Sequence, residues 1–157
     1  MSAILKEKTP GVAVLAYGYE AVARGALEAD VKVVAGFPGT PSSGCLEALT
    51  TVAKDENIHV EWATNERVAL EVAWGAAMDG QRSLCTMNHL GMNVVMDCLK
   101  YSNNYGVTGG MVVFAGDDVG ANTSAIESDS RVLATAADVP VLCPSTCLLY
   151  TSPSPRD

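Results

Sequence analysis

Short apolar runs alternate along the chain with longer stretches of helical pattern. The runs with the length and composition of buried strands are Val31–Phe37, Ile58–Ala63, Ser83–Asn88, Met111–Ala115 and Val139–Cys143. The stretches that favour helix are Tyr19–Ala29, Ser43–Glu56, Glu66–Asp79, Met92–Tyr101 and Glu127–Ala137. Strand, helix and strand repeated in this way predict right-handed βαβ crossovers. We therefore expect an α/β fold, an open parallel sheet with helices on both faces.

Polar loops follow four of the predicted strands. They read FPGTPSS from residue 37, TNE from residue 64, NHLGMN from residue 88 and GDDVGAN from residue 116. The carboxyl ends of parallel strands share one edge of a sheet, and ligands of open α/β sheets bind outside that edge. The four loops are therefore expected to form one site.

The first of these loops allows two interpretations. Gly39 permits close backbone approach and Thr40, Ser42 and Ser43 supply hydroxyls before a predicted helix, which suits an anion. The alternative is a turn whose serine caps the helix. Neither the Gly-Lys-Ser/Thr of a P-loop nor a GxGxxG motif occurs, so the two common nucleotide fingerprints are missing.

Glu66 opens a predicted helix that is apolar nearly all round, which indicates that the helix is buried. A carboxylate there is either catalytic or a first-turn residue that the helix dipole favours after an Asn65 cap. His89 could bind substrate or be structural. Arg131 follows Glu127 by four residues, which makes an ion pair within one helix the simplest interpretation.

Asp117 and Asp118 resemble a metal-binding pair, although such loop pairs more often cap or are solvated. We expect no metal site within this chain. The five cysteines form no CxxC pair, so they predict buried, reduced thiols rather than zinc or an iron–sulfur cluster.

Composition excludes several classes of protein. With 157 residues, 48% hydrophobic and 18% charged, the chain has the size and core of one globular domain. Its net charge of −8 disfavours binding to nucleic acid or to an anionic membrane. No apolar run reaches transmembrane length and no signal peptide is evident, so we expect a cytoplasmic protein.

The last eleven residues, 147–157, break the pattern of the preceding chain. CLLYTSPSPRD equals the translation of a transposase-type sequencing-library adapter. We expect this segment to be adapter read-through and the natural sequence to cover residues 1–146. A natural Ser/Pro tail is the alternative.

Taken in order, several segments resemble the start of the alpha subunit in the indolepyruvate ferredoxin oxidoreductase family. They are ARGALEA, FPGTPSS, EWATNERVALEVAWGAA, TMNHLGMNVVMD, GGMVVFAGDD and ESDSR with VPVLCPS. The likeness runs from about residue 17 to 145. Its most specific block is residues 61–80, whereas PGTPSS is shared more loosely among 2-oxoacid:ferredoxin oxidoreductases.

The resemblance implies that residues 1–146 are the pyrimidine-binding domain of a larger thiamine-diphosphate subunit. The implied activity is oxidative decarboxylation of aryl 2-oxoacids such as indolepyruvate to the acyl-CoA, with electrons passed to ferredoxin. The implied partners are a beta subunit, ferredoxin, the aryl 2-oxoacid and CoA. Mg²⁺ and iron–sulfur clusters would be held by parts outside this chain, so the chain alone is expected to be inactive.

The same resemblance implies roles for individual residues. Glu66 would be the catalytic carboxylate that hydrogen-bonds the cofactor's aminopyrimidine. Thr40 would touch the substrate and Arg131 would clamp its carboxylate. The residues implied to line the cofactor are Glu66, Pro38, Gly39, His89, Gly91 and Asn93.

Departures from the family pattern leave substrate choice and activity open. The fourth loop lacks the Pro, His and Gln-Asn of the family's usual DDPGMHSSQNEQDSR, and Asn88 stands where Lys is common. One alternative is a stand-alone α/β module that binds an anion or nucleotide. Another is a thiamine-dependent 2-oxoacid decarboxylase without iron–sulfur clusters.

Overall fold

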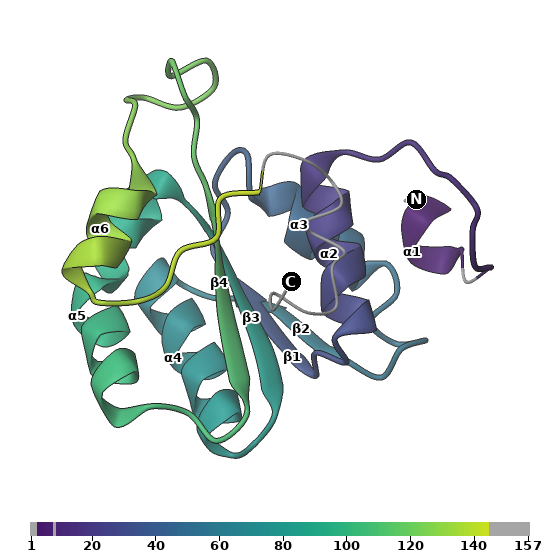
Figure 1. Cartoon of the computed structure of the whole chain (residues 1–157), viewed down its shortest axis with the longest axis horizontal. Helices are drawn as coiled ribbons and strands as arrows, with labels where there is room; N and C mark the ends of the chain where they lie inside the picture. Colours follow the sequence, from purple (N-terminus) through teal and green to yellow (C-terminus); the bar gives the residue numbers. More distant parts are fainter. Residues whose placement is uncertain (1–2, 8, 145–157) are drawn as a thin grey trace.

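Four parallel strands form one open sheet at the centre of the computed structural model (Figure 1). The structure describes residues 3–7 and 9–144. The strands are β1 (Val33–Gly36), β2 (His59–Trp62), β3 (Arg82–Asn88) and β4 (Gly110–Gly116), in the spatial order β2-β1-β3-β4. Every neighbouring pair is parallel. All four strands therefore end at the same edge, which we call the carboxyl edge.

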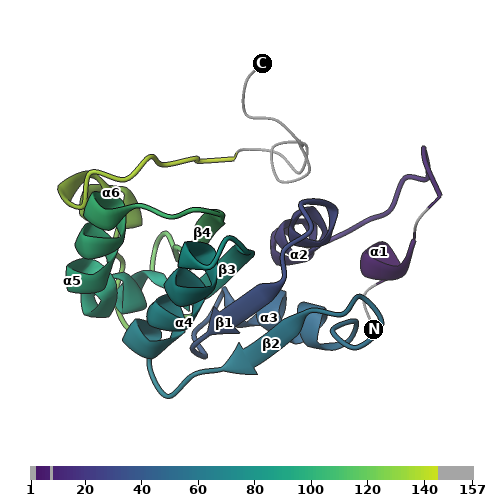
Figure 2. The ribbon, with the colours of Figure 1, turned by 90° about the horizontal axis from the view of Figure 1, so that it is seen from below.

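Helices cover both faces of this sheet (Figure 2). They are α1 (Ala3–Lys6), α2 (Gly18–Glu28), α3 (Ser43–Thr50), α4 (Glu66–Met78), α5 (His89–Tyr105) and α6 (Ser130–Ala136). Helices α2 and α3 lie on one side and α4, α5 and α6 on the other (Figures 1 and 2). In the sheet, the step from β1 to β2 and the step from β3 to β4 run in opposite directions. Right-handed crossovers therefore place the connecting helices α3 and α5 on opposite faces. The predicted α/β fold is confirmed.

Two apolar cores follow from this layering, one on each face. Leu46 and Leu49 of α3 pack with Val34 and Leu84 of the sheet on one side. The other core joins α4, α5 and the sheet, and its largest members are Leu70, Met87, Met92, Val95 and Leu99. Burial of each such side chain contributes about 1.5–3 kcal/mol. The loops of the carboxyl edge are thus mounted on strands that are packed on both faces.

Polar capping residues determine where α5 and α6 begin, and both starts differ from those that the apolar pattern predicts. The sequence predicts a helix from Met92, but α5 begins at His89 because the Asn88 side chain accepts a hydrogen bond from Gly91 N at 2.9 Å. The helix expected from Glu127 begins at Ser130, after Asp129.

Helix α3 ends at Thr50 rather than at Glu56. The hydroxyls of Thr50 and Thr51 donate to the carbonyls of Leu46 and Ala48, and the backbone tightens to three-residue bonds. Residues 51–57 form turns instead of further helix.

The fifth predicted strand, Val139–Cys143, is wrong. No strand lies beside this segment in the described chain, and Val139 N donates instead to Ala134 O of α6. Val141 and Leu142 are 42% and 80% exposed. Apolar composition alone does not make a strand, because its backbone groups need a paired neighbour.

Cys45, Cys85 and Cys98 are buried free thiols, as expected. Burial raises the pKa of Cys45 to about 12 and also raises that of Cys85. Cys143 is exposed, which contradicts the expectation for that residue, and Cys147 lies outside the described residues. In the described chain no helix is long and apolar enough to cross a membrane.

Candidate active site at the carboxyl edge

The loops after β1 and β4 and the start of α5, which follows β3 directly, meet at the carboxyl edge, around the point where the chain switches direction. The chain leaves β1 for one side of the sheet and β3 for the other, and open α/β sheets bind ligands at such a switch point. We call this position between the ends of β1 and β3 the crevice. The loop of residues 117–129 rises beyond the end of β4 before α6 (Figure 1). Ser124 Oγ of that loop donates to Thr40 O of the β1 loop at 3.4 Å. The prediction that these loops share one edge is confirmed.

The loop after β1 uses its donors within itself. Gly39 N donates to Ser43 Oγ at 2.8 Å, and Ser42 Oγ donates to Gly39 O at 2.8 Å. The backbone N–H groups of Ser42 and Ser43 also donate to Gly39 O. The loop therefore has few donors left for an anion, and Ser42 bonds backward instead of capping α3. Pro38 and Thr40 are exposed at its tip.

Glu66 stands at the first position of α4, at the carboxyl edge. Asn65 caps this helix, since its side chain accepts from Val68 N at 2.9 Å. Glu66 is half-buried, and within the described chain no hydrogen bond or ion pair engages its carboxylate. Glu66 can therefore accept hydrogen bonds from a ligand.

Gly91 lies directly against Glu66. A Cβ atom at Gly91 would stand 2.5 Å from Glu66 Cγ and 2.8 Å from Glu66 Oε1. Only glycine allows the first turns of α4 and α5 to approach this closely.

Asn88 connects this contact to the β1 loop. Its side chain packs on Gly39, where a Cβ would stand 2.8 Å from Asn88 Cγ and Nδ2. In the sequence, Asn88 stands out only as a departure from a family pattern. An Asn that ends a strand and precedes a helix is an N-cap signal, and that signal could have identified it.

His89 is completely buried rather than open to the crevice. Its Nε2 lies 2.8 Å from Ile126 O and its Nδ1 lies 3.3 Å from Gly116 O. The ring thus connects the end of β4 to the loop after it. Asn93 is exposed, and its side chain donates to Leu90 O of the same helix at 3.1 Å.

Asp117 and Asp118 organise the loop after β4. Asp118 accepts from Thr123 N and Ser124 N, both at 2.7 Å, and from the Thr123 hydroxyl at 3.0 Å. These bonds, the one from Thr123 N foremost, lower the pKa of Asp118 to about 2. Asp117 accepts from the backbone and hydroxyl of Ser130. The two carboxylates thus cap backbone N–H groups. The described residues contain no cluster able to hold a metal ion.

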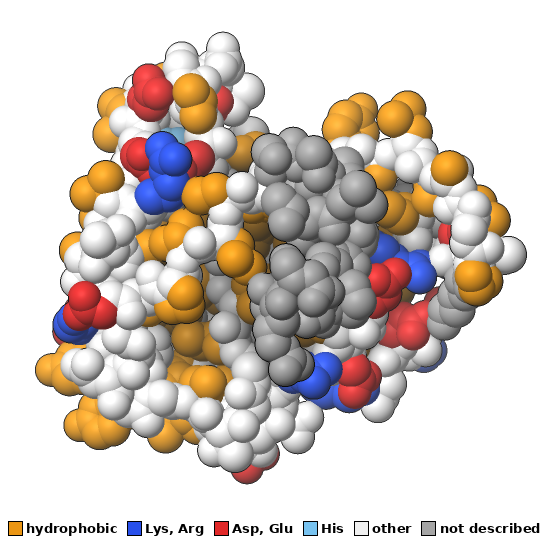
Figure 3. Space-filling model, viewed as in Figure 1, with side chains coloured by type: hydrophobic (Ala, Val, Ile, Leu, Met, Phe, Trp, Pro, Cys, Tyr) orange, Lys and Arg blue, Asp and Glu red, His pale blue; other side chains and the backbone are white. Residues whose placement is uncertain are grey.

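Arg131 is paired with the residue that caps its own helix. Its guanidinium forms a two-bond pair with Asp129, with Nε and Nη2 donating at 2.8 and 2.7 Å, and its side chain is 65% exposed. The expected intrahelical pair with Glu127 is wrong, because α6 begins only at Ser130. On the face seen in Figure 3, basic side chains generally adjoin acidic ones.

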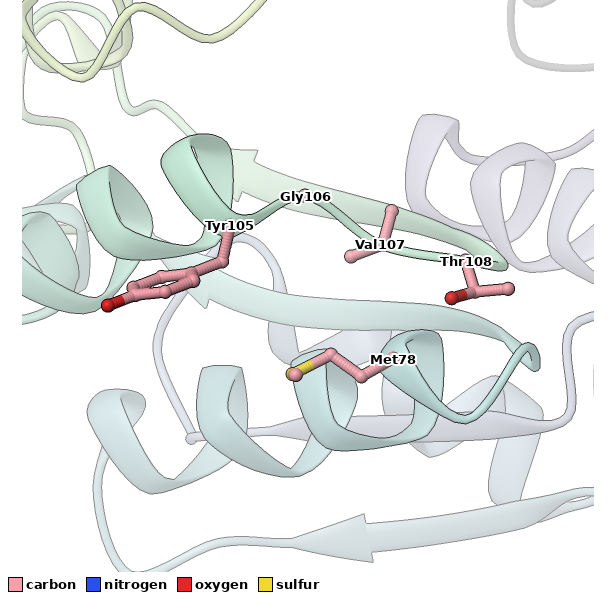
Figure 4. Close-up of a pocket in the computed structure, with 5 residues that line it drawn as sticks. All are labelled: Met78, Tyr105, Gly106, Val107 and Thr108. Atoms are coloured by element: carbon pink, nitrogen blue, oxygen red, sulfur yellow. The ribbon is translucent and has the colours of Figure 1, made fainter.

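A separate surface hollow lies at the opposite edge of the sheet. Met78 of α4 and Tyr105, Gly106, Val107 and Thr108 at the end of α5 line it (Figure 4). None of the site residues expected from the sequence lies there, so the hollow is not part of this site.

Comparison with known proteins decides the family. Residues 24–102, about half of the chain, match the family described as pyruvate flavodoxin/ferredoxin oxidoreductase, thiamine diphosphate-binding. This chain belongs to that family. The matched range includes the β1 loop, Glu66, Asn88 and Gly91, which are the residues gathered at the carboxyl edge.

Several curated relatives of this chain are subunits named IorA. The chain is 46% identical over 137 residues to indolepyruvate oxidoreductase subunit IorA of Thermococcus kodakarensis. It is 40% identical over 140 residues to the IorA subunit of Archaeoglobus fulgidus. These alignments cover 87% of the chain but 21% and 22% of the relatives, so the chain spans about a fifth of their length.

A solved structure supports the fold. The 2-oxoglutarate:ferredoxin oxidoreductase of Magnetococcus marinus matches with a TM-score of 0.61 at 16% sequence identity. The match covers 67% of this chain and 18% of that chain. At this identity the likeness concerns the fold alone.

Proposed function

We propose that this chain is the pyrimidine-binding part of a subunit that oxidatively decarboxylates aryl 2-oxoacids such as indolepyruvate to the acyl-CoA. The electrons pass to ferredoxin. The observation that carries the proposal is the unengaged, half-buried carboxylate of Glu66 at the carboxyl edge. Membership of the thiamine diphosphate-binding family and similarity to IorA subunits support it.

Glu66 suits the aminopyrimidine ring of thiamine diphosphate. A carboxylate without an internal partner accepts a hydrogen bond from a ring nitrogen and holds the proton there. Bound thiamine diphosphate supplies the electron sink for decarboxylation. The contribution of Glu66 is to hold a proton at the ring nitrogen and to fix the orientation of the ring.

The other site residues shape the space around Glu66. Gly91 lets the Glu66 side chain lie directly against the backbone of α5, and Gly39 does the same for Asn88 at the β1 loop. Pro38 borders the ring and the exposed Thr40 contacts the substrate. His89 contributes indirectly, by holding the loop after β4.

The roles proposed for Arg131 and Asn93 carry conditions. Arg131 clamps the substrate carboxylate only if it exchanges the carboxylate of Asp129 for that of the substrate. Asn93 contacts the cofactor only from the exposed rim of α5.

The remaining components belong to parts outside this chain. Mg²⁺, which would hold the diphosphate, and the iron–sulfur clusters have no ligand set among the described residues. A beta subunit, ferredoxin and CoA complete the proposed reaction. The chain alone is therefore expected to be inactive. The alternative of an anion-binding module receives little support, since the β1 loop engages its own donors.

Replacement of Glu66 in the complete enzyme tests the proposal. Glu66→Gln should lower 2-oxoacid turnover by about 10²–10⁴-fold, because the amide cannot hold the proton. Glu71→Gln on the same helix is the matched control, because Glu71 pairs with Arg67 at the surface. Parental turnover in Glu66→Gln would remove Glu66 from its role.

A further inference from the structure

We propose that Asn88 is a specificity-determining residue whose side-chain amide donates a hydrogen bond to the carboxylate of the 2-oxoacid. This inference rests on the proposed function and adds a substrate contact to it. Asn88 ends β3 and caps α5, so two regular elements hold its backbone without an intervening loop. A donor mounted in this way is pre-organised for a ligand.

The orientation of the Asn88 amide is determined by its own contacts. Its Oδ1 accepts from Gly91 N at 2.9 Å, a bond that only the oxygen can make. The Nδ2 group therefore points away from that bond. It packs against Gly39, where a Cβ would stand 2.8 Å away. Within the described chain, no acceptor takes a hydrogen bond from this Nδ2.

The position of this donor places it beside both reactive features of the site. On one side lies Gly39, the residue before the exposed Thr40. On the other lies Gly91, which contacts the Glu66 carboxylate. A ligand in the crevice thus meets an acceptor from Glu66 and a donor from Asn88.

Most other polar groups of the edge are already engaged. In the β1 loop the N–H groups of Gly39, Ser42 and Ser43 and the Ser42 hydroxyl bond within the loop. The N–H groups of Thr123 and Ser124 bond to Asp118, and the Ser124 hydroxyl bonds to Thr40 O. Arg131 pairs with Asp129, and Arg67 pairs with Glu71 and Asp97. An anionic substrate needs a donor, and the Asn88 amide is fixed and unengaged. Hydrogen bonds to ionised acceptors are the stronger ones.

Two conservative variants separate the donor from the cap in the complete enzyme. Asn88→Asp keeps the oxygen that caps α5 but replaces the donor by an anionic oxygen. Asn88→Ser keeps a capping hydroxyl and shortens the side chain away from the ligand. Loss of a hydrogen bond to a charged group should raise the KM for the 2-oxoacid about tenfold to a hundredfold. The kcat and the Tm should stay near parental values, and Asn104→Asp, on the exposed far end of α5, is the charge-matched control.

Each outcome bears on one of the two proposals. A raised KM with parental kcat in either folded variant supports the role of Asn88. A parental KM in both variants overturns it, and so does a lowered kcat at parental KM, which would mean that Asn88 acts on Glu66 instead. Should Asn88→Asp not fold, Asn88→Ser carries the same test. A parental enzyme that turns over no 2-oxoacid contradicts the proposed function itself.

Discussion

At the carboxyl edge of the sheet polar side chains take part in holding each loop, whereas at the opposite, amino edge the turn between α5 and β4 is held mainly by backbone hydrogen bonds. The carboxyl edge depends on Ser43, Asn88 and Asp118, each of which accepts hydrogen bonds from loop or helix N–H groups. At the amino edge, Thr108 N and Gly109 N both donate to Ala77 O. The turns there use Gly80 and Gly106 with φ of 86° and 74°.

The difference teaches where substitutions should act. In a turn held by backbone hydrogen bonds, exposed side chains can be replaced with little effect. An atom added where two backbone segments touch cannot be accommodated. A side-chain-held loop changes shape when its polar residue changes, and the groups of the site change position with it. Substitutions at the amino edge should therefore alter stability, and those at the carboxyl edge should alter the site.

The largest loss of stability is expected from Gly109→Ala at the amino edge. A Cβ there would stand 2.1 Å from Gln81 O, and backbone atoms cannot move aside cheaply. We expect a loss of about 3 kcal/mol in the free energy of unfolding of the chain. Chemical denaturation measures it, with Gly110→Ala as control, because that Cβ meets nothing closer than 3.8 Å. Equal stability of the two variants would contradict the backbone-held description.

At the carboxyl edge, Gly91→Ala should instead lower turnover strongly and stability only slightly. The added Cβ meets the flexible side chain of Glu66, which can rotate away, so the loss of stability should be about 1 kcal/mol. A carboxylate displaced by about 1 Å should lower turnover of the complete enzyme about a hundredfold. Steady-state kinetics and thermal unfolding of the same variant check both parts. A variant that loses stability but keeps parental turnover would show that the contact only packs the helices.

The loop after β4 should respond to acid through Asp118. Its pKa is lowered to about 2 from 3.8, so its bonds contribute stability that is fully present above about pH 4. That contribution is lost as the pH falls through the lowered pKa. The difference in unfolding free energy between the parent and Asp118→Asn should narrow from about pH 4 toward pH 2. A difference that stays constant over this range would mean that the carboxylate is not held by these bonds.

The smallest effect is expected at a glycine that belongs to neither edge. Gly75 lies inside α4, and a Cβ there meets nothing within 4 Å. Gly75→Ala should stabilise the chain by about 0.5–1 kcal/mol, because alanine favours helix. Thermal unfolding measures this shift. A destabilised variant would reveal a contact on that face of α4.

The sequence predicts the fold where local pattern and tertiary pairing agree. The apolar runs around Val34, Val60, Leu84 and Val113 are strands because each has a neighbour to pair with. The run at Val139–Cys143 has the same composition but no paired neighbour in the described chain. Helix starts follow caps such as Asn88, which apolar periodicity does not register.

The site was predictable in its place more than in its details. The order of strands and loops placed Glu66 and Gly91 at one edge, and the structure puts them in contact. The sequence could not indicate that His89 faces two carbonyl groups, because the burial of its ring depends on Ile126, in a loop 37 residues away. Nor could it show that Arg131 is held by Asp129, since two carboxylates lay within reach in the sequence.

One distance tests the central claim most directly. In a crystal structure of the complete subunit with thiamine diphosphate bound, a Glu66 carboxylate oxygen should lie about 2.6–3.0 Å from a ring nitrogen of the aminopyrimidine. The ring should occupy the crevice between the ends of β1 and β3. A ring bound elsewhere, or separated from Glu66 by more than about 4 Å, would contradict the account.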